Sequence, residues 1–174
     1  MTEPEFWKLI EDTRDELTEV HDENLVAALS KLPAKTILEF GFCWSNLSTR
    51  AYDWNLWGAA YVINGGCSDD GFMDFRTWLI LEGEAIYKAA LANPDSLADT
   101  NVQADEAGYQ CYPANDAYAE ADDAEEGVEY YEAMEKHCGP HDRREEPTGE
   151  DWDFEDQDEV QKRLPKLYKK FSDA

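Results

Sequence analysis

The sequence has few cationic residues and no long apolar segment. Its 174 residues include 15 Lys and Arg against 40 Asp and Glu, which gives a formal net charge of −25. No apolar run approaches the roughly 18 residues that a membrane-spanning helix requires. The N-terminus is acidic, whereas a secretory signal would be basic and then apolar. We therefore expect a cytoplasmic protein with no membrane contact.

Cysteine and histidine are also sparse. The four cysteines, Cys43, Cys67, Cys111 and Cys138, are scattered without a close pair, which in a cytoplasmic chain favours reduced thiols. The sequence contains no phosphate loop of Walker type, no dinucleotide fingerprint and no serine nucleophile elbow. These absences exclude the enzyme classes that such motifs identify. We predict no cofactor, and the sequence does not decide whether the protein is an enzyme.

The composition is nevertheless that of a folded protein. Hydrophobic residues make up 43% of the chain and aromatic residues 13%, which is ample for a core in a chain of this length. We predict an all-α fold, with residues 1–174 forming a single compact helical domain of six to eight helices. Residues 139–158 should form an acidic loop within it, before the last helix.

Apolar spacing and helix breakers place the expected helices. A first helix should begin at the Thr2/Glu5 capping box and extend its apolar stripe to Leu17, and Pro33 should separate the second helix from the third. Residues 95–113 should be a loop with one or two helical turns. Gly127 can bend or divide a helix over residues 114–137, and Pro165 can divide the last one. The remaining predicted helices cover 22–32, a segment beginning at 33, two segments flanking 64–70, 84–91 and about 160–171.

The stretch from Trp54 to Trp78 is the most distinctive part of the sequence. Trp54, Trp57 and Tyr61 recur at helical spacing and should line one helix face. The residues at 64–66, Asn-Gly-Gly, reach left-handed backbone conformations easily and should end that helix. The residues at 68–70, Ser-Asp-Asp, can cap the next helix.

This stretch resembles a bacterial family catalogued as domain of unknown function 4240. The resemblance is carried by Trp57-Gly58-Ala59-Ala60-Tyr61, by the run from Asn64 to Phe72, and by Phe75-Arg76 and Trp78-Leu79. The opening run from Glu5 to Glu11 and the late run from Leu164 to Tyr168 are also similar to the two ends of that family. The resemblance implies no activity, substrate or catalytic residue.

The glycine and aspartate loop at 64–74 is one candidate site. Aspartates supply oxygen ligands for Mg²⁺ or Ca²⁺ or can act as general bases, an arginine can bind an anion, and a cysteine at a helix start can be a nucleophile. Each residue type also has a structural explanation, namely helix capping, core packing, an inert thiol, or an arginine that neutralises Glu39 or Asp53. The candidate residues are Trp57, Asn64, Cys67, Asp69, Asp70, Asp74 and Arg76.

Two further sets have the composition of a site. His137, Cys138 and His141, with Cys111, are residue types that bind zinc, but their spacing fits no standard zinc module, so we predict no metal site. A second set could wall an apolar pocket with Arg50 and Arg76 as anion clamps, although aromatic residues at helical spacing also build ordinary cores. This aromatic set comprises Trp54, Trp57, Tyr61, Phe72, Phe75 and Trp78.

The negative charge is concentrated in one part of the chain. Between Tyr118 and Glu159 there are 18 acidic and 3 basic residues. Such a field repels nucleic acid and attracts basic proteins or divalent cations, at rates that fall as salt screens it. We therefore expect no direct nucleic-acid binding. An acidic surface can also serve solubility alone.

The interpretation that we favour is a non-catalytic, acidic protein-binding or regulatory module that engages a basic partner. An immunity protein or a nucleic-acid mimic would have such a sequence. In this interpretation charge speeds association, and aromatic side chains among the acids slow dissociation. The alternative is a small-molecule or metal-dependent site at the 64–74 loop. The candidate partner-binding residues are Glu150, Asp151, Trp152, Asp153, Phe154, Glu155 and Asp156.

Overall fold

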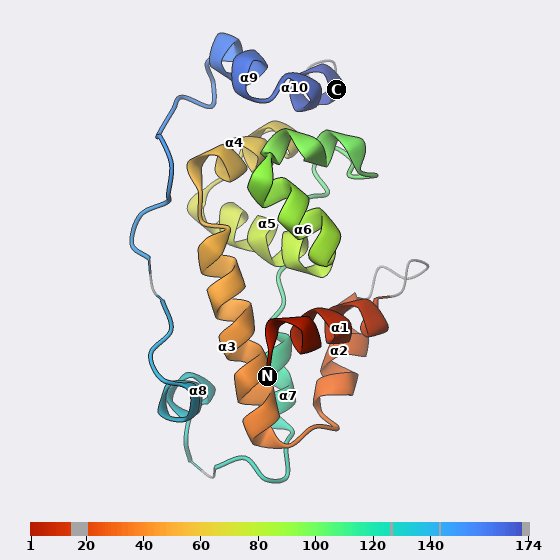
Figure 1. Cartoon of the computed structure of the whole chain (residues 1–174), viewed down its shortest axis with the longest axis vertical. Coiled ribbons are helices and arrows are strands. Elements are labelled where there is room, and N and C mark those ends of the chain that lie inside the picture. Colours follow the sequence, from red (N-terminus) through yellow and green to blue (C-terminus); the bar gives the residue numbers. More distant parts are fainter. Residues whose placement is uncertain (15–20, 126, 143, 172–174) are drawn as a thin grey trace. The chain divides into compact units, whose positions relative to one another are not determined.

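The computed structural model describes residues 1–14, 21–125, 127–142 and 144–171, and every regular element in these ranges is helical (Figure 1). The all-α prediction is thus confirmed. The elements are α1 (Glu3–Thr13), α2 (His21–Leu29), α3 (Ala34–Arg50), α4 (Trp54–Ile63), α5 (Asp69–Leu81), α6 (Glu84–Ala92), the 3₁₀ helix η1 (Pro94–Asp99), α7 (Pro113–Ala119), α8 (Tyr130–Cys138), α9 (Gln157–Arg163) and α10 (Pro165–Phe171).

The described residues contain more helices than the six to eight predicted. Pro165 begins α10 rather than continuing α9, because proline lacks the N–H that a helix interior requires. The segment predicted over 114–137 divides into α7 and α8, with Gly127 at φ +75° between them. In the predicted loop over 95–113, η1 adds a short 3₁₀ helix. Leu17 lies outside the described residues.

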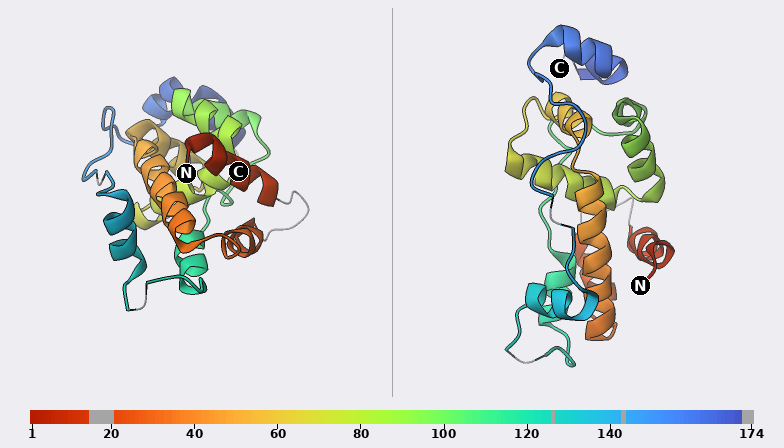
Figure 2. Two further views of the ribbon diagram at one scale, coloured as in Figure 1. Left: turned by 60° about the horizontal axis from the view of Figure 1, so that its bottom comes forward. Right: turned by 60° about the vertical axis from the view of Figure 1, so that its left-hand side comes forward.

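The chain divides into two compact units, which we describe separately. The first comprises residues 1–47 and 111–143. In it α2 packs against both α1 and α7 (Figures 1 and 2). Its aromatic core includes Phe6 stacked on Phe40, with ring centroids 4.6 Å apart, and Trp44 within 6.2 Å of Phe6.

Gly41 permits a close approach inside the first unit. An ideal Cβ atom at this position would lie 1.6 Å from the Tyr130 hydroxyl oxygen and 2.9 Å from Tyr130 Cζ. Gly41 has a low helix propensity, but its lack of a side chain lets the buried Tyr130 ring of α8 pack against α3. Burial also raises the pKa of Tyr130.

The second unit comprises residues 48–110 and 144–174. In it α10 packs against α4, α9 and η1, while α6 packs against η1 and α5 (Figure 1). The buried Asp95 carboxylate of η1 accepts hydrogen bonds from the backbone N–H groups of Lys166, at 2.9 and 3.1 Å, and Leu167, at 2.9 Å. Asp95 thus satisfies free N–H groups at the start of α10, a capping role normally filled by the residue just before a helix.

Within the part of the chain that the structure describes, no helix is both long enough and apolar enough to cross a membrane.

We expect Gly41→Ala to lower the free energy of unfolding by about 2 kcal/mol, because the new methyl group overlaps Tyr130. Helix propensity alone would predict a gain of up to about 1 kcal/mol. Urea unfolding followed by circular dichroism measures the difference.

Gly71→Ala in α5 is the matched control, because its nearest contacts to an added Cβ are ordinary ones at 3.4 and 3.5 Å. It should not destabilise the protein. Tyr130→Phe removes the oxygen nearest to the new methyl group, so the cost of Gly41→Ala should be smaller in that background. If Gly41→Ala lowered the free energy of unfolding equally in both backgrounds, overlap with the Tyr130 hydroxyl would not be the cause.

Candidate functional site

The 64–74 loop begins where α4 ends. Its backbone turns through Gly65 at φ +62° and Gly66 at φ +145°, conformations that favour glycine. The Gly66 N–H donates to the Tyr61 carbonyl at 2.9 Å. The Asn-Gly-Gly run therefore ends α4, as the sequence predicts.

Asn64 holds a distant segment of the second unit in place. Its Nδ2 donates to the Ala107 carbonyl at 2.8 Å, and its Oδ1 accepts from the Ala107 N–H at 3.1 Å. Ala107 is fully buried. Both polar groups of the Asn64 amide are thus used to pair a backbone that would otherwise lack partners.

Trp57 lies inside an aromatic stack. Its ring is nearly parallel to Trp54, with centroids 5.3 Å apart, and to Phe72, with centroids 4.9 Å apart. Its indole Nε1 donates to the Cys67 carbonyl at 3.0 Å. Trp57 is half-buried, and these contacts hold the loop against the neighbouring rings.

The Cys67 thiol is in the wrong environment for a nucleophile. Burial, together with the negative charge of Asp74, raises its pKa from 9.0 to about 11. The reactive thiolate is therefore scarce at neutral pH. The inert interpretation of Cys67 fits this environment, and the nucleophilic one does not.

The three aspartates do not converge. Asp69 and Asp70 are exposed in the first turn of α5, and the capping role belongs to Ser68, whose Oγ accepts from the Gly71 N–H at 3.2 Å. Asp74 is half-buried and its backbone carbonyl accepts from the Tyr109 N–H at 3.1 Å. Among the described residues, no three His, Cys, Asp or Glu side chains are grouped so that they could hold a metal ion.

Arg76 stacks on aromatic rings instead of pairing with an acid. Its guanidinium carbon lies 4.7 Å from the centroid of Tyr52 and 5.3 Å from that of Phe72. Its Nη1 donates to the Ser48 carbonyl in the last turn of α3 at 3.1 Å. Burial lowers the pKa of Arg76. The anticipated ion pair of Arg76 with Glu39 or Asp53 is not found among the described residues. Capping the end of α3 accounts for its position.

The histidine and cysteine set at 137–141 belongs to the first unit. His137 Nε2 lies 3.4 Å from Glu39, and His141 Nδ1 lies 3.6 Å from Glu135. Among the described residues, these two histidines, Cys111 and Cys138 form no group that could hold a metal ion.

The other candidate region is the acidic strap, which we define as residues 145–156 of the second unit. It contains no helix (Figures 1 and 2). Near its start Thr148 forms a parallel bridge with Asp53 at the beginning of α4, where the Trp54 N–H donates to the Thr148 carbonyl at 2.9 Å. At its end the Asp156 side chain caps α9.

Trp152 is not the exposed anchor that the sequence suggested. It is only 8% exposed, because its ring packs where a Cβ at Gly58 would lie 2.1 Å from Trp152 Cζ2. Phe154 is half-buried, with its ring 4.8 Å from Trp152 and 5.6 Å from Tyr61. Both side chains attach the strap to α4, so neither is presented to a partner as an isolated apolar group.

The carboxylates of the strap face solvent. The residues on either side of Trp152 and Phe154, namely Asp151, Asp153 and Glu155, are all exposed. Residues 154 and 155 form a turn in which Asp153 Oδ1 accepts from the Glu155 N–H at 2.9 Å. The Glu155 carboxylate accepts from the Tyr61 hydroxyl at 3.2 Å, and Glu150 pairs with Arg163 at 3.0 Å.

The comparison with protein families gives one match. The model of a family described as a protein of unknown function (DUF4240) matches residues 1–124, which is well over half of the chain. This chain belongs to the DUF4240 family. No curated protein and no solved structure matches it.

Only one of the two candidate regions of this DUF4240 protein lies within the residues that match the family. The 64–74 loop lies inside the matched residues, whereas the acidic strap, α9 and α10 lie beyond them. The late run from Leu164 to Tyr168, which the sequence comparison took as similar to the end of the family, also lies outside the match.

Sequence reasoning missed several residues that organise the second unit. It did not anticipate that the Trp152 ring packs against Gly58. The alternation Asp-Trp-Asp-Phe-Glu at 151–155 is the signal that could have indicated that the aromatic side chains pack against the protein. The capping role of Asp95 has no local signal, because its partners are some 70 residues away.

We expect Asn64→Ala in this DUF4240 protein to lower the free energy of unfolding by about 2 kcal/mol, because it leaves the buried polar groups of Ala107 unpaired. Asn115→Ala, an exposed helical asparagine, should change it by less than about 0.5 kcal/mol. Chemical unfolding of both variants tests this. Equal stability of the two would show that the Asn64 clamp is dispensable.

The thiol of Cys67 should alkylate with a midpoint near pH 11, measured with iodoacetamide after the other three cysteines are changed to serine. Because the pKa is raised from 9.0 to about 11, the thiolate fraction at pH 8 falls about 100-fold. The rate should rise about tenfold per pH unit up to that midpoint. A plateau below pH 9 would contradict the environment described.

Proposed function

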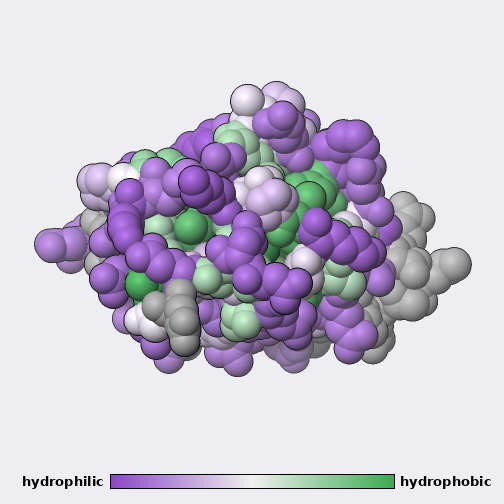
Figure 3. Space-filling view, turned by 90° about the horizontal axis from the view of Figure 1, so that it is seen from below, coloured by the Kyte–Doolittle hydropathy of each residue, from purple (hydrophilic) through white to green (hydrophobic). Residues whose placement is uncertain are grey.

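We propose that this protein is a cytoplasmic, non-catalytic binding module whose acidic strap engages a basic protein, in the manner of an immunity protein or a nucleic-acid mimic. The observation that carries the proposal is the exposure of Asp151, Asp153 and Glu155 on a segment that Trp152 and Phe154 attach to α4. It is supported by the overall charge of −25. Figure 3 shows hydrophilic residues covering most of one face, with hydrophobic residues in small areas between them.

Attachment of the strap favours binding because it reduces the ordering cost. A free acidic segment must lose backbone and side-chain freedom when a partner binds, whereas an attached segment has already lost much of it. Thr148 at the start of α4, Trp152 at Gly58 and Phe154 at Tyr61 hold the strap along α4. The carboxylates then meet a cationic partner as a ready surface.

The alternative site at the 64–74 loop has weaker support. Asn64, Trp57 and Arg76 each have a structural partner that accounts for them, as described above. The Cys67 thiol is protonated at neutral pH. Binding of a basic partner at the strap is therefore the function that the geometry supports best.

A labelled peptide of alternating lysine and glycine should bind the protein at low salt, and the dissociation constant should rise with salt. Changing Asp151, Asp153 and Glu155 to their amides should raise the dissociation constant about tenfold, since each exposed ion pair contributes about 0.5 kcal/mol. Fluorescence anisotropy measures both effects. The amides should preserve the turn in which Asp153 Oδ1 accepts from the Glu155 N–H at 2.9 Å.

The matched control changes Asp122, Glu129 and Glu132 of the first unit to amides. These side chains are exposed and the net charge changes by the same amount. We expect a smaller effect, about twofold, because only the general field is weakened. An equal loss in the two triple variants would assign binding to overall charge and would overturn the role of the strap.

A further inference from the structure

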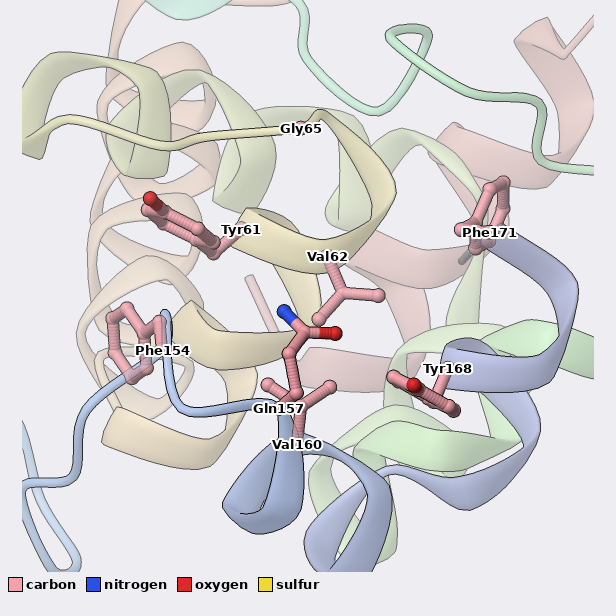
Figure 4. A pocket seen from close by; sticks show the side chains of 8 residues that line it. All are labelled: Tyr61, Val62, Gly65, Phe154, Gln157, Val160, Tyr168 and Phe171. Atoms are coloured by element: carbon pink, nitrogen blue, oxygen red, sulfur yellow. The ribbon is translucent and has the colours of Figure 1, made fainter. Parts of the chain in front are cut away.

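A groove opens in the second unit beside the strap. Its cavity volume is about 170 Å³ (Figure 4). Four aromatic side chains line it: Tyr61 from α4, Phe154 from the strap, and Tyr168 and Phe171 from α10. Val62 and Val160 add apolar surface. The groove therefore offers ring faces from three segments that the attached strap brings together.

Two polar side chains in this groove make no hydrogen bond to any residue that the structure describes. They are the exposed Gln157 amide and the half-buried Tyr168 hydroxyl, so both can donate to or accept from a bound group. In Figure 4 the Gln157 amide lies between the Tyr61 and Phe154 rings on one side and Val62 and Tyr168 on the other. Apolar walls with a few polar groups among them are typical of a binding site.

The charge beside the groove is negative at the Tyr61 end. The Tyr61 hydroxyl donates to Glu155 at 3.2 Å. Burial, the bond to Glu155 and the charges of Glu155 and Asp153 raise the pKa of Tyr61. At the Phe171 end Lys170 lies 5.4 Å from the ring centroid and donates to the carbonyls of Ala98 and Thr100. A cation would therefore enter from the Tyr61 end.

The size of the groove limits its occupant. Sites for drug-sized ligands measure about 300–1,000 Å³, so about 170 Å³ is too small for a nucleotide or a cofactor. It suits one long side chain. Arginine meets each feature best, because a guanidinium stacks on aromatic faces and carries five donors for carboxylate, amide and hydroxyl oxygens.

We infer that the groove between α4, the acidic strap and α9–α10 receives one arginine side chain of the basic partner. This inference rests on the proposed function. The guanidinium stacks on the ring faces of Tyr61 and Phe154 and donates to the Gln157 amide oxygen, while the strap carboxylates neutralise its charge. The strap then provides attraction, and the groove provides selectivity for arginine over lysine.

The test compares two labelled peptides, one alternating arginine with glycine and the other lysine with glycine, by fluorescence anisotropy. The wild-type protein should bind the arginine peptide at least about threefold more tightly. Gln157→Ala should weaken the arginine peptide about fivefold, the effect of about one hydrogen bond, and should abolish the preference. Tyr168→Phe, which removes only the hydroxyl, should reduce the preference for the arginine peptide.

Gln161→Ala is the matched control, since Gln161 is an exposed glutamine on the same helix outside the groove lining. It should retain both the affinity and the preference. If the strap amides weaken binding while Gln157→Ala behaves like Gln161→Ala, the groove inference fails and the proposed function stands. If wild type binds both peptides equally, the inference also fails. If it binds neither, both fail.

Discussion

The packing of the Trp152 ring against Gly58 is the contact on which the acidic surface of the second unit depends. An added Cβ at Gly58 would lie 2.1 Å from the ring, so only a helix lacking a side chain there can accept it. Burial of an aromatic side chain contributes about 2 to 3 kcal/mol. This gain offsets part of the cost of ordering the strap, which is about 1 to 2 kcal/mol per residue.

The same contact decides how the charge is displayed. An unattached acidic segment would be an expanded, mobile chain, because its like charges repel one another. Here the aromatic residues alternate with the acids, and their burial turns Asp151 and Asp153 toward solvent. The strap also builds one wall of the neighbouring groove through Phe154. Charge display and groove formation are therefore two consequences of one packing arrangement.

In the 64–74 loop, the same residue types could either bind a ligand or form hydrogen bonds within the protein. Asn64, Asp70 and Arg76 are residue types that bind metals or anions. The same polar atoms can instead form hydrogen bonds with backbone groups of the protein itself. The Asn64 amide pairs both polar groups of Ala107, and Arg76 reaches the end of α3. These partners are distant in sequence, so the pattern of the loop alone could not distinguish the two roles.

The sequence by itself determined the all-helical class, the breaks at Pro33 and Pro165 and the glycine turn after α4, because propensity, proline and glycine act locally. It also determined the concentration of charge. Tertiary structure alone decided that Trp152 is buried and that Asp95 caps α10. Each of these depends on which of several suitable groups the packed chain brings within contact distance, and that choice is made by long-range packing.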